Sequence, residues 1–237
     1  MMMAGLLFFL WRAIFQNSVD LNMPFNHLIT YVCLGQVISL TRISWVQRNI
    51  LYRAVSRIRT GDIVIDFVRP VDYQAFRLTD AVGLFIAEIA LINLPAYLLS
   101  ILLLGIDPPA SLEAAIGFSI SLIGAFLIAF SMNYLMNMMT FWTMETLGLM
   151  HAQKAIIDIL AGSLIPLSLL PDFLRIIALY LPFQAMAYVP LSIYIGAIAG
   201  ADIWIEILKQ GGWVVGMLLL TRWLWVKVSK KIVIQGG

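Results

Sequence analysis

The sequence predicts an all-α integral membrane protein with six transmembrane helices, the first of them truncated, and a re-entrant helical hairpin before the last span. Three observations lead to this prediction. Of the 237 residues, 62% are hydrophobic and 12% are charged, whereas soluble domains have roughly 45–50% apolar and about 25% charged residues. Long apolar segments are separated by short polar breaks, and seven of the fifteen basic residues lie between Arg42 and Arg77. So many apolar residues cannot be buried in one water-soluble core of this size.

The first apolar segment runs from Met1 to Phe15 and is interrupted only by Arg12. A helix of about 15 residues reaches about 22 Å, which is short of a hydrocarbon core of about 30 Å. An early basic region and a small-residue cleavage site would mark a signal peptide, and neither is visible. We therefore interpret the segment as the end of a span whose beginning precedes this sequence.

The next three spans follow from apolar length and from helix breakers. We expect a second span at 27–46, a third at 81–106 and a fourth at 113–141. Asp107-Pro108-Pro109 separates the third from the fourth, because proline lacks a backbone donor and restricts the residue before it. These two spans form a predicted hairpin across the bilayer.

The orientation follows from the bias of Lys and Arg toward cytoplasmic loops. The basic segment 41–80 and the tail at the end of the last span are predicted to be cytoplasmic; the basic residues of the tail are Arg222, Lys227, Lys230 and Lys231. The turn at 107–113 has no basic residue and is predicted to be external. By alternation, the loop around 145–154 is cytoplasmic.

Four prolines interrupt the region between residues 155 and 200. Residues 156–170 give one short fifth span. Asp172 is a candidate helix N-cap for an amphipathic piece at 173–181, and a second apolar piece follows at 183–199. Because a span needs about 20 residues, we expect external re-entrant helices at 171–200.

The last span is expected at 211–226, after a polar interlude at 202–210. Trp223 and Trp225 stand where aromatic side chains of the membrane interface are enriched. The two residues therefore predict that this end of the span meets the interface.

Polar residues inside the spans are candidates for a substrate pathway, because an ionisable group in lipid is costly. Glu88 either faces a neighbouring helix or lines a substrate route. Asn93 lies on the same span, and Asn133 and Asn137 are four residues apart on the fourth span, where interhelical hydrogen bonds are the first expectation. Lys154 and Asp158 have the spacing of a structural ion pair on a helix.

The sequence shows no catalytic motif. His27 and His151 are the only histidines and are far apart, without paired cysteines or carboxylates at metal-ligand spacing. There is no phosphate-binding glycine loop and no nucleophile elbow. The single cysteine excludes an internal disulfide, and a net charge of +2 does not suggest nucleic-acid binding. We therefore expect no enzyme and no metal site.

The basic segment contains a short amphipathic element. Residues 53–59 continue the second span as a helix, Gly61 and Asp62 interrupt it, and the apolar run at 63–68 ends at Arg69-Pro70. Such an element either docks into a groove of a soluble partner or lies on anionic lipid with its arginines at the headgroups. The residues alone do not choose between these two.

The run IRTGDIVIDFVRPVDYQAF at 58–76 resembles the cytoplasmic segment between the second and third spans of type-2 ABC exporter permeases, and the viologen-exporter-like branch in particular. LAGSLIPLSLLPDFLRIIALYLPFQAMAYVPLSIYIG at 160–196 is similar to that branch's fifth span and external re-entrant helices. FLWRAIF at 9–15 is similar to the end of its first span. The resemblance covers essentially the whole chain, which departs from it only in lacking the cytoplasmic lead-in and a complete first span.

The resemblance implies one permease domain over 1–237, whose cytoplasmic loop at 47–80 carries a coupling helix. Such permeases pair as homodimers or heterodimers in the cell inner (plasma) membrane and recruit a separate ABC ATPase subunit. ATP and Mg²⁺ are bound there, and this chain binds no cofactor. Export, including drug efflux, is the implied activity. The residues carried over to the coupling element are Gly61, Asp62, Ile63, Ile65, Asp66, Phe67, Arg69 and Pro70.

Two other functions are compatible with a polytopic membrane protein. A secondary transporter or channel would work without ATP, and Glu88 is the one ionisable candidate along the spans for it. A membrane enzyme acting on lipid lacks a catalytic constellation. The substrate is open, since cationic drugs, lipids and peptide products all suit an apolar route.

Overall fold

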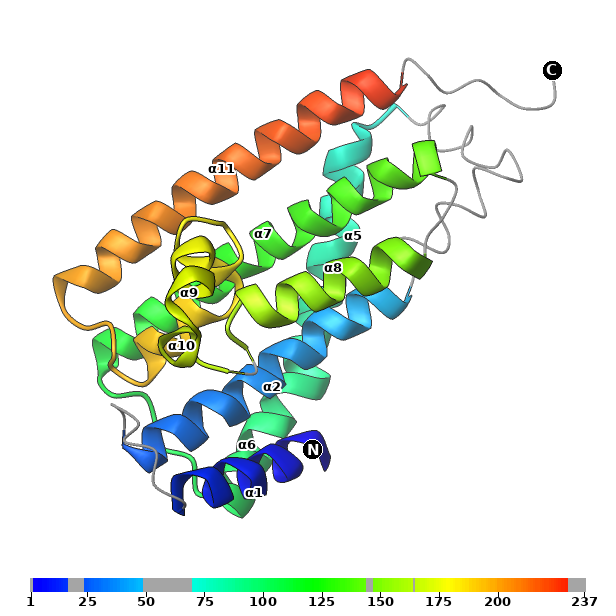
Figure 1. Cartoon of the computed structure of the whole chain (residues 1–237). Coiled ribbons are helices and arrows are strands. Elements are labelled where there is room, and N and C mark those ends of the chain that lie inside the picture. Colours follow the sequence, from blue (N-terminus) through cyan, green and yellow to red (C-terminus); the bar gives the residue numbers. More distant parts are fainter. Residues whose placement is uncertain (1, 17–23, 49–69, 144–146, 164, 230–237) are drawn as a thin grey trace.

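The computed structural model describes residues 2–16, 24–48, 70–143, 147–163 and 165–229. Every regular element within these ranges is a helix, as predicted. Figure 1 shows the axes of α2 (Phe25–Arg48), α7 (Leu112–Thr143), α8 (Leu147–Leu160) and α11 (Ala201–Ser229) roughly aligned, with α8 running opposite to the other three. Three helices in the described part are long and apolar enough to cross a membrane, at Tyr73–Leu104, Leu112–Met139 and Ala201–Ser229. The count of six spans therefore stays a prediction.

Helix α7 forms the centre of the fold and matches the predicted fourth span. Its first turn is capped by Ser111, whose hydroxyl accepts a hydrogen bond from the backbone N–H of Ala114 at 3.0 Å. Helices α10 (Tyr188–Tyr194) and α11 both pack along it. The 32-residue helix is about 48 Å long, so it extends well beyond one hydrocarbon core.

The third span is a continuous helix with an irregular turn in its middle. It consists of α5 (Tyr73–Glu88), the π-helical turn η1 (Ile89–Asn93) and α6 (Leu94–Leu104). It begins where Asp72 accepts a hydrogen bond from the Ala75 N–H at 3.0 Å, and it ends at Gly105, whose φ is +62°. The predicted start at residue 81 was too late. The helix begins at Tyr73 and includes the polar residues that precede the apolar stretch.

Helix α11 is one continuous element, so the predicted polar interlude at 202–210 was wrong. Its polar residues make ion pairs and hydrogen bonds. The Lys209 ammonium lies 2.7 Å from the Glu206 carboxylate of the same helix, and the Trp204 indole donates a hydrogen bond to Glu113 of α7 at 3.0 Å. Glycines inside a helix cost only about 1 kcal/mol each relative to alanine. Gly211 and Gly212 therefore do not interrupt it.

Helix α8 corrects the prediction of a loop around 145–154. Residues 147–154 are helical, whereas Glu145 lies outside the described residues. No proline occurs between Leu147 and Gly162, and Gly162, whose φ is +72°, follows the end of the helix at Leu160. The expected ion pair within α8 is confirmed, with Lys154 Nζ 2.7 Å from the Asp158 carboxylate.

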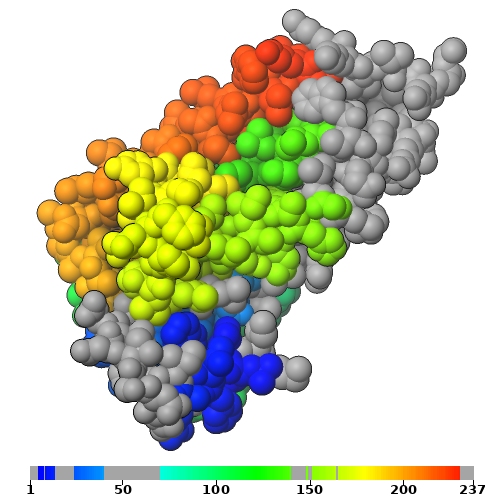
Figure 2. Space-filling view, in the orientation of Figure 1, coloured from blue at the N-terminus to red at the C-terminus, as the bar shows by residue number. Residues whose placement is uncertain are grey.

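Short helices occupy the region predicted to be re-entrant. They are η2 (Leu167–Leu169), α9 (Asp172–Leu179), η3 (Gln184–Met186) and α10. Pro171, not Asp172, is the N-cap of α9, and Asp172 is instead its first residue, 2.8 Å from Arg175. Figure 2 shows this segment (yellow) as one surface mass beside α8 and α11. Its re-entrant placement stays a prediction.

Helix α2 packs against the turn that follows α8. The Tyr31 hydroxyl donates to the carbonyl oxygen of Gly162 at 2.7 Å. One turn along α2, Gly35 lies so close to this turn that an added Cβ would stand 2.4 Å from the carbonyl oxygen of Ser163. Helix α1 (Met2–Gln16) also packs on α2. Helix α2 therefore contacts both α1 and the turn after α8.

A buried glutamine joins three elements on the other side of α7. The Gln210 side-chain amide donates to the carbonyl oxygens of Ser121 at 2.9 Å and Ala185 at 2.8 Å. Gly124 provides the space, since a Cβ there would lie 2.6 Å from the Gln210 side chain. Helices α7 and α11 and the turn η3 are thereby held together by one side chain.

Candidate functional site

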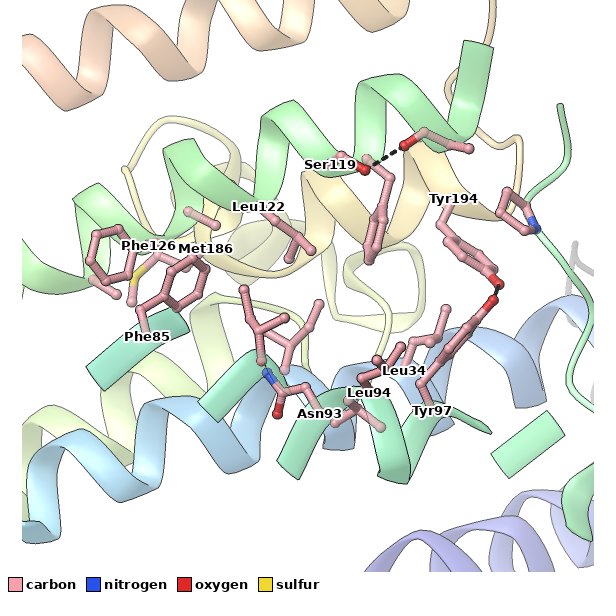
Figure 3. Close-up of a pocket in the computed structure, with 18 residues that line it drawn as sticks. Leu34, Phe85, Asn93, Leu94, Tyr97, Ser119, Leu122, Phe126, Met186 and Tyr194 are labelled. Carbon is pink, nitrogen blue, oxygen red and sulfur yellow. Dashed lines mark hydrogen bonds between the residues drawn. The ribbon is translucent and has the colours of Figure 1, made fainter. Parts of the chain in front are cut away.

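An apolar pocket of about 310 Å³ lies between the third span, α2 and α7. Figure 3 shows Phe85, Phe126 and Met186 at one end of it and Tyr97 and Tyr194 at the other. Four of the lining side chains have polar atoms, namely Asn93, Tyr97, Ser119 and Tyr194. The other lining residues are Leu34, Val37, Ile38, Phe85, Ile89, Leu94, Pro109, Ala115, Phe118, Leu122, Ala125, Phe126, Ala129 and Met186.

The π-helical turn η1 determines which residues of the third span face this pocket. A π turn contains one more residue than an α turn. Phe85 lines the pocket before the turn, Ile89 and Asn93 line it as the first and last residues of the turn, and Tyr97 lines it beyond the turn. A regular α-helix would instead favour residues one position earlier, at 92 and 96. The turn therefore brings an amide and a phenol to an otherwise apolar wall.

A directed chain of hydrogen bonds closes one end of the pocket. The Tyr97 and Tyr194 hydroxyl oxygens are 2.8 Å apart, and the Tyr194 hydroxyl donates to the carbonyl oxygen of Asp107 at 3.1 Å. Because Tyr194 has one hydroxyl hydrogen and uses it on Asp107, Tyr97 is the donor between the two phenols. The Tyr97 oxygen keeps its acceptor capacity, and the chain joins α6, α10 and the turn before α7.

The four residues proposed for a substrate pathway lie in different places. Asn93 lines the pocket. Glu88 is buried, with 3% of its surface exposed, and immediately precedes η1, but it is not one of the lining residues. Asn133 and Asn137 are buried farther along α7 and are also outside the lining set. Membership of all four residues in a substrate pathway stays a prediction.

The expected interhelical hydrogen bond of the fourth span is present at Asn133. Its side-chain oxygen accepts from the Gln153 amide of α8 at 3.0 Å. The Asn137 amide donates within α7, to the Asn133 carbonyl oxygen at 2.9 Å. The Asn133–Gln153 bond links α7 to α8 between two buried side chains, which is the structural role that the sequence suggested for Asn133.

Most of the predicted coupling element lies outside the described residues. Gly61, Asp62, Ile63, Ile65, Asp66, Phe67 and Arg69 belong to 49–69, and only Pro70 is described, with an exposed side chain. Sequence reasoning gave no role to the residues that come next in the chain. They are fastened to the C-terminal end of α11.

We call this group of contacts the clasp; its residues are Asp72, Tyr73, Gln74, Thr221, Arg222 and Trp225. Asp72 and Arg222 form an ion pair, and the Gln74 amide donates to the Thr221 hydroxyl at 2.8 Å. The Tyr73 and Trp225 rings are stacked with their centroids 4.3 Å apart. The start of the third span and the end of α11 are thus bound together.

The two tryptophans near the end of α11 have different surroundings, and their placement at the membrane interface stays a prediction. Trp223 is 54% exposed, as an interfacial side chain would be, but Trp225 is only 8% exposed. Tyr73 covers it. The sequence spacing could have predicted the burial of Trp225, because residues 221, 225 and 228 share one face of α11. All three of these residues are buried.

Opposing effects set the pKa of Asp72. Its burial alone would raise the pKa, but the hydrogen bonds from the Arg222 guanidinium and the Ala75 N–H, together with the charge of Arg222, outweigh that effect and lower the pKa. A carboxyl whose pKa is lower in the folded state stabilises it above the unfolded pKa, and this contribution is lost as the pH falls through the folded value.

We therefore expect Asp72→Asn to remove an acid-sensitive part of the stability. At pH 7 the loss should be less than about 1 kcal/mol, since the pair is half exposed. Thermal unfolding in detergent between pH 7 and pH 3 measures it: the wild type should lose this contribution below about pH 4, and the variant should not. Arg222→Gln should behave like Asp72→Asn, whereas Lys227→Gln, on the same end of α11, should keep the wild-type acid response. Identical pH profiles for all four proteins would contradict the assignment.

Among the described residues, no group of three or more His, Cys, Asp or Glu side chains is arranged to hold a metal ion. The described part thus presents an apolar pocket in the membrane region and a clasp at one end of the spans. The pocket suits a protein that binds or moves an apolar ligand.

The comparisons with known proteins give one family. The model of the ABC-2 family transporter proteins matches residues 1–236. Neither a curated protein nor a solved structure matches the chain. Because the family match covers nearly the whole sequence, it includes the pocket, the clasp and the spans. In this family the membrane subunit in general partners an ABC ATPase subunit, and the chain is accordingly a multi-pass membrane protein of the ABC-2 transporter family, that is, a type-2 ABC permease.

Proposed function

We propose that this chain is the transmembrane subunit of an ATP-driven exporter and moves a substrate outward when a separate ATPase subunit hydrolyses ATP. The family match over residues 1–236 carries the proposal. The resemblance of 58–76 to the coupling segment of the viologen-exporter-like branch supports the more specific assignment. ATP and Mg²⁺ belong to the ATPase, and this permease hydrolyses nothing.

The coupling element would be the segment 61–70, seated in a cleft of the ATPase on the cytoplasmic side of the inner membrane. The clasp supports this position for mechanical reasons. Residues 71 and 72 directly follow the coupling element, and Asp72 is paired with Arg222. A displacement of the element would therefore act on the third span and on α11 together. A second permease copy or a related chain would complete the transport pathway.

The experiment that tests the proposal is recruitment of the ATPase from membranes. Phe67→Asp and Gly61→Pro should each abolish both co-purification of the ATPase and transport, while the chain still inserts into the membrane. A charge at Phe67 disfavours burial in an apolar cleft, and proline at Gly61 removes a backbone donor. Phe173→Asp is the matched control: Phe173 is 64% exposed on α9, on the proposed external side, and this variant should still recruit the ATPase.

The outcomes separate the rival functions. Normal ATPase recruitment by both Phe67→Asp and Gly61→Pro would refute the coupling assignment. Transport that resists vanadate but stops when the proton gradient collapses would instead favour a secondary transporter. In that case Glu88→Gln should abolish transport.

A further inference from the structure

The pocket is long and narrow. Along α7, its lining residues occur at 115, 118, 119, 122, 125, 126 and 129, which is one helical face. At 1.5 Å per residue, this stripe extends over about 21 Å. The volume of about 310 Å³ is only about twice that of an engineered cavity that holds benzene. A volume of this size spread over such a length accommodates an extended chain better than a group of fused rings.

The interior of the pocket disfavours charge. None of its lining residues is Asp, Glu, Lys, Arg or His. Moving an unpaired charge into such surroundings is very costly, whereas each buried methylene contributes about 0.8 kcal/mol. The part of a ligand that enters the pocket is therefore an uncharged hydrocarbon.

The two ends of the pocket differ in chemistry. At one end the Phe85 and Phe126 rings are stacked 4.2 Å apart between centroids. At the other, Tyr97 offers an acceptor oxygen, beside Tyr194 and the carbonyl oxygen of Asp107. Figure 3 shows these ends on opposite sides of the aliphatic stretch. A molecule with a polar head and an apolar tail matches this difference.

The charge around the polar end restricts the head group further. The sequence has no Lys or Arg between Arg77 and Lys154, whereas Asp107 and Glu113 lie on the turn beside Tyr97 and at the start of α7. These segments therefore provide no Lys or Arg side chain that could pair with an anionic head group. A hydroxyl head can donate to the Tyr97 oxygen without a change in charge.

We propose that the pocket binds the single hydrocarbon chain of a long-chain amphiphile with an uncharged hydroxyl head. The head lies at Tyr97 and Tyr194, and the tail extends along α7 to Phe85 and Phe126. Binding of this kind requires neither ATP nor the partner ATPase. It can therefore be tested separately from the proposed export function.

Photolabelling of the purified full chain tests the orientation. The probes are two hexadecanol derivatives with a diazirine either at the tail tip or next to the hydroxyl, used in a steroid-based detergent that has no alkyl chain. Mass spectrometry should place the tail-tip label near Phe85 and Ala129 and the head-proximal label near Tyr97 and Ala115. The reverse pattern, or equal labelling of both regions by both probes, would overturn the proposal.

Two substitutions test the site itself. Ala115→Phe and Ala129→Phe, combined, narrow the pocket and should lower labelling by the tail-tip probe about tenfold, which corresponds to about 1.4 kcal/mol. Ile123→Phe, at a residue of α7 that is 56% exposed, should label like the wild type. An equal loss in Ile123→Phe, or no loss in the double variant, would contradict a site inside the pocket.

Competition with the unmodified protein gives a result that does not depend on folding of a variant. Alcohols of increasing chain length should compete better until the tail fills the pocket, and then no better. A short aromatic dication without a long alkyl chain should not compete. Displacement of the label by that dication, or affinity independent of chain length, would refute a hydrocarbon-chain site.

Discussion

Gly35→Ala should destabilise the protein by about 1–3 kcal/mol, the range expected for an extra methyl group in a packed interior. The added Cβ would stand 2.4 Å from the Ser163 carbonyl oxygen, a backbone atom of the turn that follows α8. Since Gly162 in this turn has a φ of +72° and its carbonyl oxygen accepts from Tyr31, the turn cannot move without loss of that hydrogen bond. Thermal unfolding in detergent measures the effect.

Gly216→Ala is the matched control for this substitution. Gly216 lies inside α11, and nothing stands within 4 Å of the position of its added Cβ. Alanine is favoured over glycine in a helix by about 1 kcal/mol, so this variant should be as stable as the wild type or more stable. An unchanged melting temperature of Gly35→Ala would contradict the close contact between α2 and the turn that follows α8.

Gln210→Leu should lower the free energy of unfolding by about 1–3 kcal/mol, the cost of leaving buried hydrogen-bonding groups without a partner. The Gln210 amide donates to two backbone carbonyl oxygens, at Ser121 and Ala185, and water does not reach this site because the side chain is 3% exposed. Leucine has a similar volume and restores neither bond. Chemical or thermal unfolding, followed by tryptophan fluorescence, measures the loss.

Gln184→Leu provides the corresponding change at an exposed site. Its amide donates to the Leu179 carbonyl oxygen at the surface, where water can replace it. The expected change is within about 0.5 kcal/mol. Equal effects of the two substitutions would show that the bridge between α7, α11 and η3 does not stabilise the fold.

The third and fourth spans were largely predictable from apolar length and from helix breakers. Apolar length and the Asp107-Pro108-Pro109 break identified the third and fourth spans within a few residues, except at the start of the third, where polar residues continue the helix. The predicted interlude before the last span failed for a related reason. Charged residues such as Glu206 and Lys209 pair with each other on a helix surface, so polarity alone does not end a helix.

The pocket could not be predicted, because its signal is weak in a membrane helix. Residues of α7 are apolar on nearly all sides, so the stripe from Ala115 to Ala129 does not differ in composition from the faces beside it. Asn93 was identified because a polar residue in a span is costly. Tyr97 and Tyr194 were missed, since they are 97 residues apart in the sequence and no local pattern brings them together.

The π-helical turn gives the two halves of the third span different neighbours. Before the turn, Tyr73 and Phe85 stack on aromatic rings of α11 and α7; after it, α6 lies against α2, and Tyr97 meets α10. In a regular α-helix one additional residue would rotate everything beyond it by about 100°. The wider π turn absorbs this rotation, so that residues from both halves still line one pocket. Deletion of one residue within 89–93 would therefore give a regular α-helix whose side chains beyond the deletion keep their present directions, whereas insertion of a further residue would rotate the second half as a block.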